Sequence, residues 1–488
     1  MRKVKKGLYT VVAGALAGML MLSGCSKSET GAGNGEASEE SSAPSIELNM
    51  TMMTESQNDT SEKEAWESIA QSYMDKNPGV TINMEVQNFG GVEQHRAWVT
   101  TQLIAGTAPD IFMTRRIWDH EDLNKGQLVD LTPYFKEPSA YLGDKSLEGT
   151  ISPSVLAQLI GAQKQYASVP TYVDVVRVLY NKDLFTKAGI EKVPQTWNEF
   201  MDAQAKLKDS GVTPFAFPNS KPGDFNYSWT SRILTEELIA NTYPELDVSG
   251  NGFIEINEYV RGVDQGLIDI EKSPYKDMFG IIKDWSQYWS KGYNGLDMNS
   301  SNDLFLRGEA AMIMRTSAQS KVMFESKARQ FEMASFPLPY LTQDNHPDAA
   351  GKLMEIGGVP AGNLAIPATI PKEKLEAAID FLRFTVSPEI QGSMADKLYR
   401  APVTENADLP EKLAGFKFAG EQMKLNIYGG EVDKNVTENN QKLGQLFLDG
   451  KITQEKYISQ LKKVMVDGVN KLMTTNDWNK ENNYGITK

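Results

Sequence analysis

The chain has 488 residues but only one cysteine and three histidines. A single cysteine cannot form a disulfide within the chain, so the fold must be stabilised by its hydrophobic core. His95, His120 and His346 lie too far apart in sequence for any short metal-binding spacing. The sequence also contains no Gly-x-Ser-x-Gly nucleophile elbow and no phosphate-binding glycine loop. These absences argue against most enzyme classes, and we expect neither a catalytic residue nor a catalytic cofactor.

Basic residues are also relatively few. The 50 lysines and arginines are outnumbered by 64 aspartates and glutamates, which gives a formal net charge of −14. Nucleic-acid binding requires a basic surface, so this balance argues against a nucleic-acid partner. It is compatible with a neutral ligand.

The first 25 residues have the layout of a bacterial secretory signal peptide. A basic stretch at 2–6 and an apolar run at 7–22 precede Leu22-Ser23-Gly24-Cys25. A cysteine directly after Leu-Ser-Gly resembles the lipobox of bacterial lipoproteins, in which the thiol is acylated and becomes the first mature residue. We therefore predict a signal peptide over 1–24, palmitate-type lipidation at Cys25 and anchoring to the outside of the cell membrane. The alternative is an ordinary cleavage site with a chance cysteine.

The segment that follows is poor in large apolar residues. Residues 25–45 are rich in Ser, Gly, Glu and Ala. Such a composition cannot bury enough surface to fold, so we predict a flexible tether over 25–45.

Beyond the tether, the apolar pattern is typical of an α/β fold. Alternating apolar residues predict strands over 46–52 and 80–86, and helical spacing after a capping-box pattern at Ser61 predicts a helix between them. This strand–helix–strand order is what a parallel sheet requires. An apolar strand is predicted over 175–180, and Trp285 and Trp289 are interpreted as core residues of a helix. The further predicted helices span 92–105, 197–208, 278–291, 372–386 and 388–398.

Seven segments, in order along the chain, resemble family 1 extracellular solute-binding proteins, the family that includes maltose-binding protein. The first is Gly106-Thr107-Ala108-Pro109-Asp110-Ile111, similar to the family's G-x-x-P-D-I signature. The others span 126–131, 166–170, 179–185, 194–200, 305–312 and 364–367. Most of these residues have structural roles: Pro109 fixes φ, Thr196 caps a helix and Gly308 ends one.

The resemblance implies a two-lobe, type II periplasmic-binding-protein-like fold with hinge strands and an interlobe cleft. The N-terminal lobe would hold 46–173 and 364–405, and the C-terminal lobe 174–357 and 406–488. The hinge strands would lie near 172–178 and 357–366. The implied function is that of a monomeric, membrane-anchored protein that captures a carbohydrate, expected to be an oligosaccharide, by lobe closure for an ABC permease.

Saccharide sites combine aromatic platforms with polar side chains. Arg115, Arg116 and Trp118 provide this mixture in what we predict to be a loop after a strand. The position at which relatives usually have a stacking tryptophan is Ala318 here, which weakens the carbohydrate assignment. The predicted ligand-binding residues are Arg115, Trp118, Tyr172, Asp174, Trp229, Arg315, Gly357 and Gly358.

A twelve-residue segment follows the spacing of an EF-hand calcium loop. Residues 247–258 place oxygen ligands at positions 1, 3, 5, 7, 9 and 12 and a glycine at position 6. We predict a structural Ca²⁺ site in this loop; the alternative is a glycine-rich Asx turn without metal. The predicted ligands are Asp247, Ser249, Asn251, Phe253, Glu255 and Glu258.

Two other functions remain open on the sequence alone. One is a surface enzyme that processes glycosides with two carboxylates, because 64 acidic residues always allow some pair. The other is a carbohydrate adhesin without a transport role.

Overall fold

The computed structural model describes residues 45–486, apart from 55–59, 90, 162, 221–225, 356, 405, 418–419 and 426–431. Cys25, the predicted signal peptide and the predicted tether up to residue 44 lie outside the described residues. Pro44–Lys488 form one compact unit, to which the following description applies. Within the part that the structure describes, no helix combines the length and apolar character needed to cross a bilayer.

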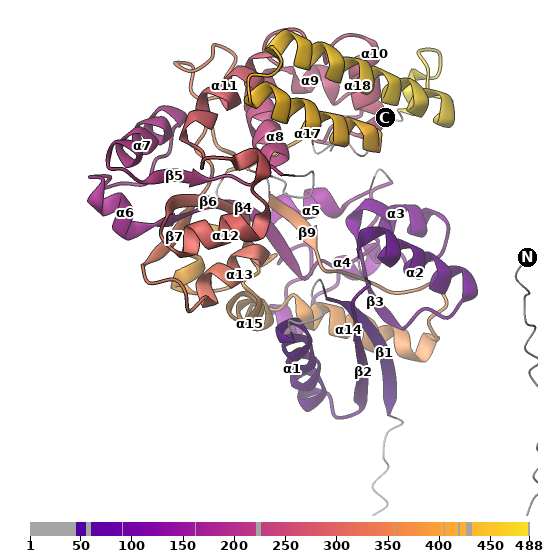
Figure 1. Cartoon of the computed structure of the whole chain (residues 1–488). Coiled ribbons are helices and arrows are strands. Elements are labelled where there is room, and N and C mark those ends of the chain that lie inside the picture. The colour runs from indigo at the N-terminus through magenta and orange to yellow at the C-terminus, as the bar shows by residue number, and fades with distance from the viewer. Residues whose placement is uncertain are drawn as a thin grey trace, which may run out of the picture. The chain divides into compact units, whose positions relative to one another are not determined.

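The first sheet begins with the predicted strand–helix–strand unit. Strand β1 (Ile46–Met53) and strand β2 (Val80–Gln87) are parallel, with Ile46 opposite Val80, and helix α1 (Ser61–Lys76) connects them. Strand β3 (Ile111–Thr114) is parallel to β1, and β10 (Asn363–Ala365) is antiparallel to β3. The strand order is therefore β10-β3-β1-β2. Figure 1 shows α1 beside β2.

The core of this part of the molecule lies between the sheet and its helices. The alternating residues Leu48, Met50 and Met52 are buried, as predicted. Tyr73 of α1 packs edge-on against Phe381, with ring centroids 5.1 Å apart. The other helices here are α2 (Val92–Ala105), α3 (Arg116–Asn124), α4 (Thr132–Phe135), α5 (Pro153–Leu159), α14 (Lys372–Thr385) and α15 (Pro388–Leu398).

The second sheet is centred on a long strand, β4 (Tyr172–Asn181). Strands β6 (Ala310–Thr316) and β7 (Met333–Phe336) are antiparallel to β4, and β5 (Thr213–Ala216) is parallel to β6. The order is β5-β6-β4-β7, and β9 (Gly357–Ala361) pairs with the beginning of β4. Strand β8 (Met354–Glu355) forms a separate two-stranded sheet with β11 (Glu421–Gln422).

Ten α-helices that lie wholly within the described residues accompany the second sheet. Trp285 and Trp289 are buried among them, which confirms their predicted core role. Figure 1 shows the last two helices side by side near α10. The helices are α6 (Lys182–Lys187), α7 (Trp197–Asp209), α8 (Asn226–Ile239), α9 (Tyr243–Leu246), α10 (Ile256–Asp264), α11 (Asp277–Trp285), α12 (Met298–Leu306), α13 (Ser317–Glu325), α17 (Lys434–Leu448) and α18 (Gln454–Asn476).

Two segments connect the two sheets. The chain enters β4 at Tyr172, three residues after Val169, which bridges to Leu364 of β10. In the other direction, β9 pairs with β4 and continues into β10, which belongs to the first sheet. The pairing of β4 with β9 shifts register between Asp174 and Val175. The start of β4 therefore lies at the crossing between the sheets.

Two local predictions were wrong. Ser61 is the first residue of α1 and not its cap: the N-cap is Thr60, whose side chain makes no capping hydrogen bond and whose hydroxyl donates to the Glu64 carboxylate at 2.7 Å. The helix predicted over 278–291 ends at Trp285 and continues as a 3₁₀ turn over Ser286–Tyr288. By contrast, Thr196 caps α7 in a full capping box with Glu199, as a threonine before a helix should.

Candidate ligand-binding site

Asp174 lies at the crossing between the sheets, and its carboxylate is held from two directions. Oδ1 accepts a hydrogen bond from Ser317 Oγ at 2.9 Å and another from Arg400 Nη1 at 3.2 Å. The side chain nevertheless remains 34% exposed. Two donors therefore fix the orientation of this carboxylate while part of it stays accessible.

Arg400 is the central contact of this group. Its guanidinium lies over the ring of Tyr172, 4.4 Å from the centroid, in cation–π geometry. It also approaches Glu62 Oε1 at 3.7 Å, and the Arg400 side chain is only 8% exposed. A buried arginine is thus placed between two carboxylates and against an aromatic face.

The residues of this group come from elements that flank both sheets. Glu62 lies in the first turn of α1, which follows β1 of the first sheet, whereas Ser317 begins α13, which follows β6 of the second. The two helices also touch, because Lys321 Nζ donates to Ser61 Oγ. We call Glu62, Tyr172, Asp174, Ser317 and Arg400 the crossing cluster.

Arg115 and Trp118 do not lie in a loop, which corrects the prediction. Helix α3 begins directly after β3, with Arg115 as its N-cap. The Arg115 guanidinium lies 3.7 Å from Sδ of Met53, at the end of β1. Trp118 is buried, donates from Nε1 to Thr114 Oγ1 at 2.9 Å and packs edge-on against His95. Arg115, with an extended backbone, is the one residue between β3 and α3.

His95 shows how enclosed this region is. Burial lowers the pKa of His95 to about 4, and the charge of Arg115 also acts to lower it. Its Nε2 lies 3.0 Å from the Met113 carbonyl oxygen. His95 is therefore neutral at physiological pH and belongs to the packing around Trp118.

Trp229 and Arg315 are buried in the part of the molecule built around the second sheet. Trp229 is the fourth residue of α8 and is buried in the core there. The Arg315 guanidinium bonds to Asn302 Oδ1 at 2.9 Å and to Ser301 Oγ at 2.5 Å, both on α12. The role of these two residues in ligand binding stays a prediction.

Gly357 and Gly358 do lie beside the cluster. Both belong to β9, and Gly357 is the register partner of Val175, the residue after Asp174. The structure thus gathers Tyr172, Asp174 and the two glycines at the crossing. Three members of the cluster, Glu62, Ser317 and Arg400, were missed because nothing in their local sequence distinguishes them from surface residues.

Comparison with known proteins identifies the family. Residues 58–392 match the family model of the bacterial extracellular solute-binding proteins.

The chain belongs to this family.

The names of the curated relatives of this solute-binding protein describe binding proteins. A putative binding protein of Brucella abortus is 30% identical over 152 residues, covering 31% of this chain and 34% of the relative. The chain thus spans about a third of that relative's length. An ABC transporter extracellular-binding protein of Pyrococcus horikoshii is 25% identical and covers 64% of this chain and 69% of the relative. A Brucella abortus sn-glycerol-3-phosphate-binding periplasmic protein is 26% identical over 55% of each chain.

Solved structures show the shared two-lobe fold. The apo-form of RafE from Streptococcus pneumoniae superposes with a TM-score of 0.66 at 16% identity, covering 88% of this chain and 99% of RafE. The sugar-binding protein MalE from Xanthomonas citri gives a TM-score of 0.65 at 14% identity, covering 89% and 100%. A chitin oligosaccharide binding protein gives 0.62 at 18% identity, covering 87% and 99%. The predicted fold class is confirmed.

The predicted calcium loop of the solute-binding protein lies between α9 and α10. Asp247 accepts hydrogen bonds from the backbone amides of Asn251 and Gly252 at 3.1 and 2.9 Å. Glu258 is fully buried and accepts from the amides of Ser249 and Glu255 at 2.8 and 2.9 Å. In the part of the chain with described coordinates, no three His, Cys, Asp or Glu residues group as a metal site. The calcium site stays a prediction.

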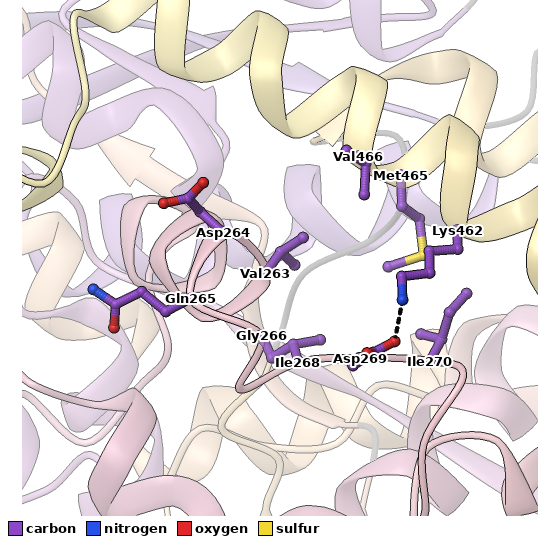
Figure 2. A pocket seen from close by; sticks show the side chains of 10 residues that line it. All are labelled: Val263, Asp264, Gln265, Gly266, Ile268, Asp269, Ile270, Lys462, Met465 and Val466. Atoms are coloured by element: carbon purple, nitrogen blue, oxygen red, sulfur yellow. Dashed lines mark hydrogen bonds and ion pairs between the residues drawn. The ribbon is translucent and has the colours of Figure 1, made fainter.

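Two hollows lie elsewhere in the second lobe. Figure 2 shows one of them, of about 250 Å³, between the end of α10 and α18, where Lys462 Nζ lies 2.7 Å from Asp269 Oδ1. A second hollow of about 140 Å³ is lined partly by Glu236, and burial raises the pKa of this carboxyl to about 7. No residue of the crossing cluster lines either hollow. We place the candidate ligand site at the crossing cluster because both lobes contribute to it there.

Proposed function

We propose that this protein is the membrane-anchored, carbohydrate-capturing subunit of an ABC importer. It binds a saccharide by lobe closure and delivers it unchanged to the permease. The observation that carries this proposal is Asp174, a partly exposed carboxylate held by Arg400 and Ser317 at the crossing between the lobes. Sugar hydroxyls donate well to such a carboxylate, and ligands that touch both lobes favour the closed state.

The carbohydrate class also draws support from proteins of the same fold. Solved neighbours include MalE, a chitin oligosaccharide binding protein and RafE in complex with raffinose. A phosphorylated alternative is represented by the sn-glycerol-3-phosphate-binding relative. The crossing cluster favours the neutral saccharide, because its two carboxylates, Asp174 and Glu62, would repel a phosphate.

Binding is tested by a thermal-shift panel of maltose, raffinose, galactose, xylo-oligosaccharides, chitin oligosaccharides and sn-glycerol 3-phosphate. We expect one saccharide to raise the melting temperature, since a ligand present at 100 times its Kd stabilises by about 2.7 kcal/mol. The same saccharide should reduce the radius of gyration measured by X-ray scattering, whereas non-binding sugars of the panel should not.

The saccharide recovered after incubation should be chemically intact by chromatography. Release of a shorter sugar would contradict this proposal and would favour the alternative that the protein is a glycosidase. A shift by sn-glycerol 3-phosphate alone would refute the carbohydrate class, and binding without contraction would refute lobe closure.

We also propose that 247–258 binds a structural Ca²⁺. The loop supplies oxygen atoms at the EF-hand positions, and Glu258 is buried where a bidentate ligand is required. A chelator should lower the melting temperature of the wild type, and Glu258→Gln should reproduce that loss and abolish the response to chelator. Glu245→Gln, an exposed change just before the loop, is the matched control and should behave like wild type. A wild type that is indifferent to chelator would rule out the site.

A further inference from the structure

The backbone conformation on either side of Arg400 fixes the position of this residue. Helix α15 ends at Leu398, and Tyr399 turns the chain in the left-handed region with φ of 58°. Two residues later, the Ala401 carbonyl oxygen accepts a hydrogen bond from the Val173 amide at 2.8 Å. A bulky residue in the left-handed region is uncommon, so this turn is a specific feature. It holds Arg400 opposite the segment that carries Tyr172 and Asp174.

Two residues hold the Arg400 guanidinium in place, and a third, Asp174, accepts its hydrogen bonds. Tyr172 supports the planar guanidinium from one side, and Glu62 of α1 approaches its Nη2. The target is Asp174, whose Oδ1 lies 3.2 Å and whose Oδ2 lies 3.4 Å from Nη1. A planar, always charged fork with fixed donors suits this role better than a flexible ammonium group.

Asp174 receives a second restraint from helix α13. Ser317 Oγ donates to Oδ1 at 2.9 Å, and Ser317 is itself fixed as the first residue of α13. The accessible part of the Asp174 carboxylate therefore has a single orientation. A ligand hydroxyl that meets a pre-oriented acceptor does not have to order it, which improves affinity without any direct contact to Arg400.

We propose that Arg400 is a positioning residue for ligand capture, which acts by holding the Asp174 carboxylate ready to accept hydrogen bonds from saccharide hydroxyls. This inference rests on the proposed function. It assigns Arg400 a role in affinity that is separate from its contribution to stability. Because Arg400 acts through Asp174, its effect on affinity disappears when Asp174 no longer carries the carboxylate.

The test is a double-mutant cycle on ligand affinity. The probe is the saccharide of the panel above that gives the largest thermal shift, titrated by calorimetry into wild type, Asp174→Asn, Arg400→Met and the double variant. We expect at least a tenfold loss for each single variant. In the Asp174→Asn background, Arg400→Met should cost less than about twofold more, since coupled residues are not additive. Arg400→Lys should fall between wild type and Arg400→Met.

A matched control distinguishes the loss of affinity in Arg400→Met from a general effect of removing a buried arginine. Arg383 has a side chain that is 13% exposed and pairs with Glu137 at 2.6 Å on the first lobe. Arg383→Met should leave affinity unchanged. If Arg400→Met does not fold, Arg400→Lys replaces it in the cycle, because it keeps the charge and removes the planar fork that faces Asp174.

Each outcome decides between the two claims. Arg400→Met that binds like wild type, or that loses the same affinity with and without the Asp174 carboxylate, overturns the positioning role and leaves the proposed function intact. A wild type that binds no saccharide overturns the proposed function and this inference with it.

Discussion

Replacing Glu355 by glutamine is expected to destabilise the protein by about 3–5 kcal/mol, because it leaves a buried guanidinium without its counter-charge. Glu355 Oε2 lies 2.6 Å from Arg177 Nη2, and both side chains are essentially inaccessible to solvent. Burial lowers the pKa of Arg177, while the neighbouring carboxylate of Glu355 opposes this shift. Glutamine keeps the shape of the side chain and removes only the charge.

The other bonds of Arg177 show why the loss should be large. Its Nε donates to the Gly415 carbonyl at 2.7 Å and Nη2 to the Lys417 carbonyl at 2.8 Å. These bonds tie β4 to the 3₁₀ segment Glu411–Phe416 and to the residue that follows it. They satisfy hydrogen-bond donors but do not neutralise the charge. The guanidinium cannot move to water without disrupting this packing around β4.

Chemical denaturation measures the effect, with two comparisons. Glu309→Gln removes the partner of Arg307 in a pair that is more than half exposed, and should cost no more than about 0.5 kcal/mol. Replacing both buried partners, as in Arg177→Met with Glu355→Met, should recover much of the loss because no charge is left buried. A Glu355→Gln variant as stable as Glu309→Gln would contradict this account.

Much of the fold could be predicted from the sequence because its signals are local. Helix α2 and helix α15 have the bounds that were predicted, since apolar periodicity and flanking Gly106 or Pro388 act within a few residues. The alternation in β1 and the capping box of α7 are local in the same way. Trp285 was also interpreted correctly as core, because a helix with a wide apolar face must bury it.

The candidate site could be predicted only in part because its residues are distant in sequence. Asp174 and Tyr172 could be located from the family's hinge strand, but Arg400 and Ser317 reach them across 226 and 143 positions. No periodicity or spacing reports such contacts. The aromatic residues posed the opposite problem: Trp118 and Trp229 fit a sugar platform by type, yet both are buried, and composition near a strand end does not reveal which way a ring points.

Strand β4 carries one residue of the buried ion pair and one residue of the candidate ligand site. Arg177 and Asp174 both lie on β4, three residues apart, so the strand that carries the buried ion pair also carries the partly exposed carboxylate. The register shift after Asp174 separates the part of β4 that pairs with β9 from the part within the second sheet. We therefore expect Glu355→Gln to reduce stability with little effect on saccharide affinity at temperatures where the variant is folded.

Replacing Cys25 by serine is expected to release the protein from the membrane almost completely. A thiol that is acylated after Leu-Ser-Gly carries the entire anchor that the sequence predicts. Each buried CH₂ of a lipid chain contributes about 0.8 kcal/mol, and two acyl chains hold a protein stably at a bilayer. A hydroxyl at this position cannot form the thioether, so the acyl anchor is lost. Immunoblots of washed membranes and of the medium measure the distribution, and mass spectrometry of the mature N-terminal peptide detects the acyl groups.

The matched control for this anchor is Ser26→Ala, which changes the next residue and leaves the thiol in place. It should retain the protein in the membrane fraction with an acylated N-terminal peptide. Because the predicted tether separates the anchor from the folded lobes, the released Cys25→Ser protein should bind saccharide with the affinity of the wild type. Membrane retention of Cys25→Ser equal to that of Ser26→Ala would show that another segment holds the protein, and the lipid anchor would have to be abandoned.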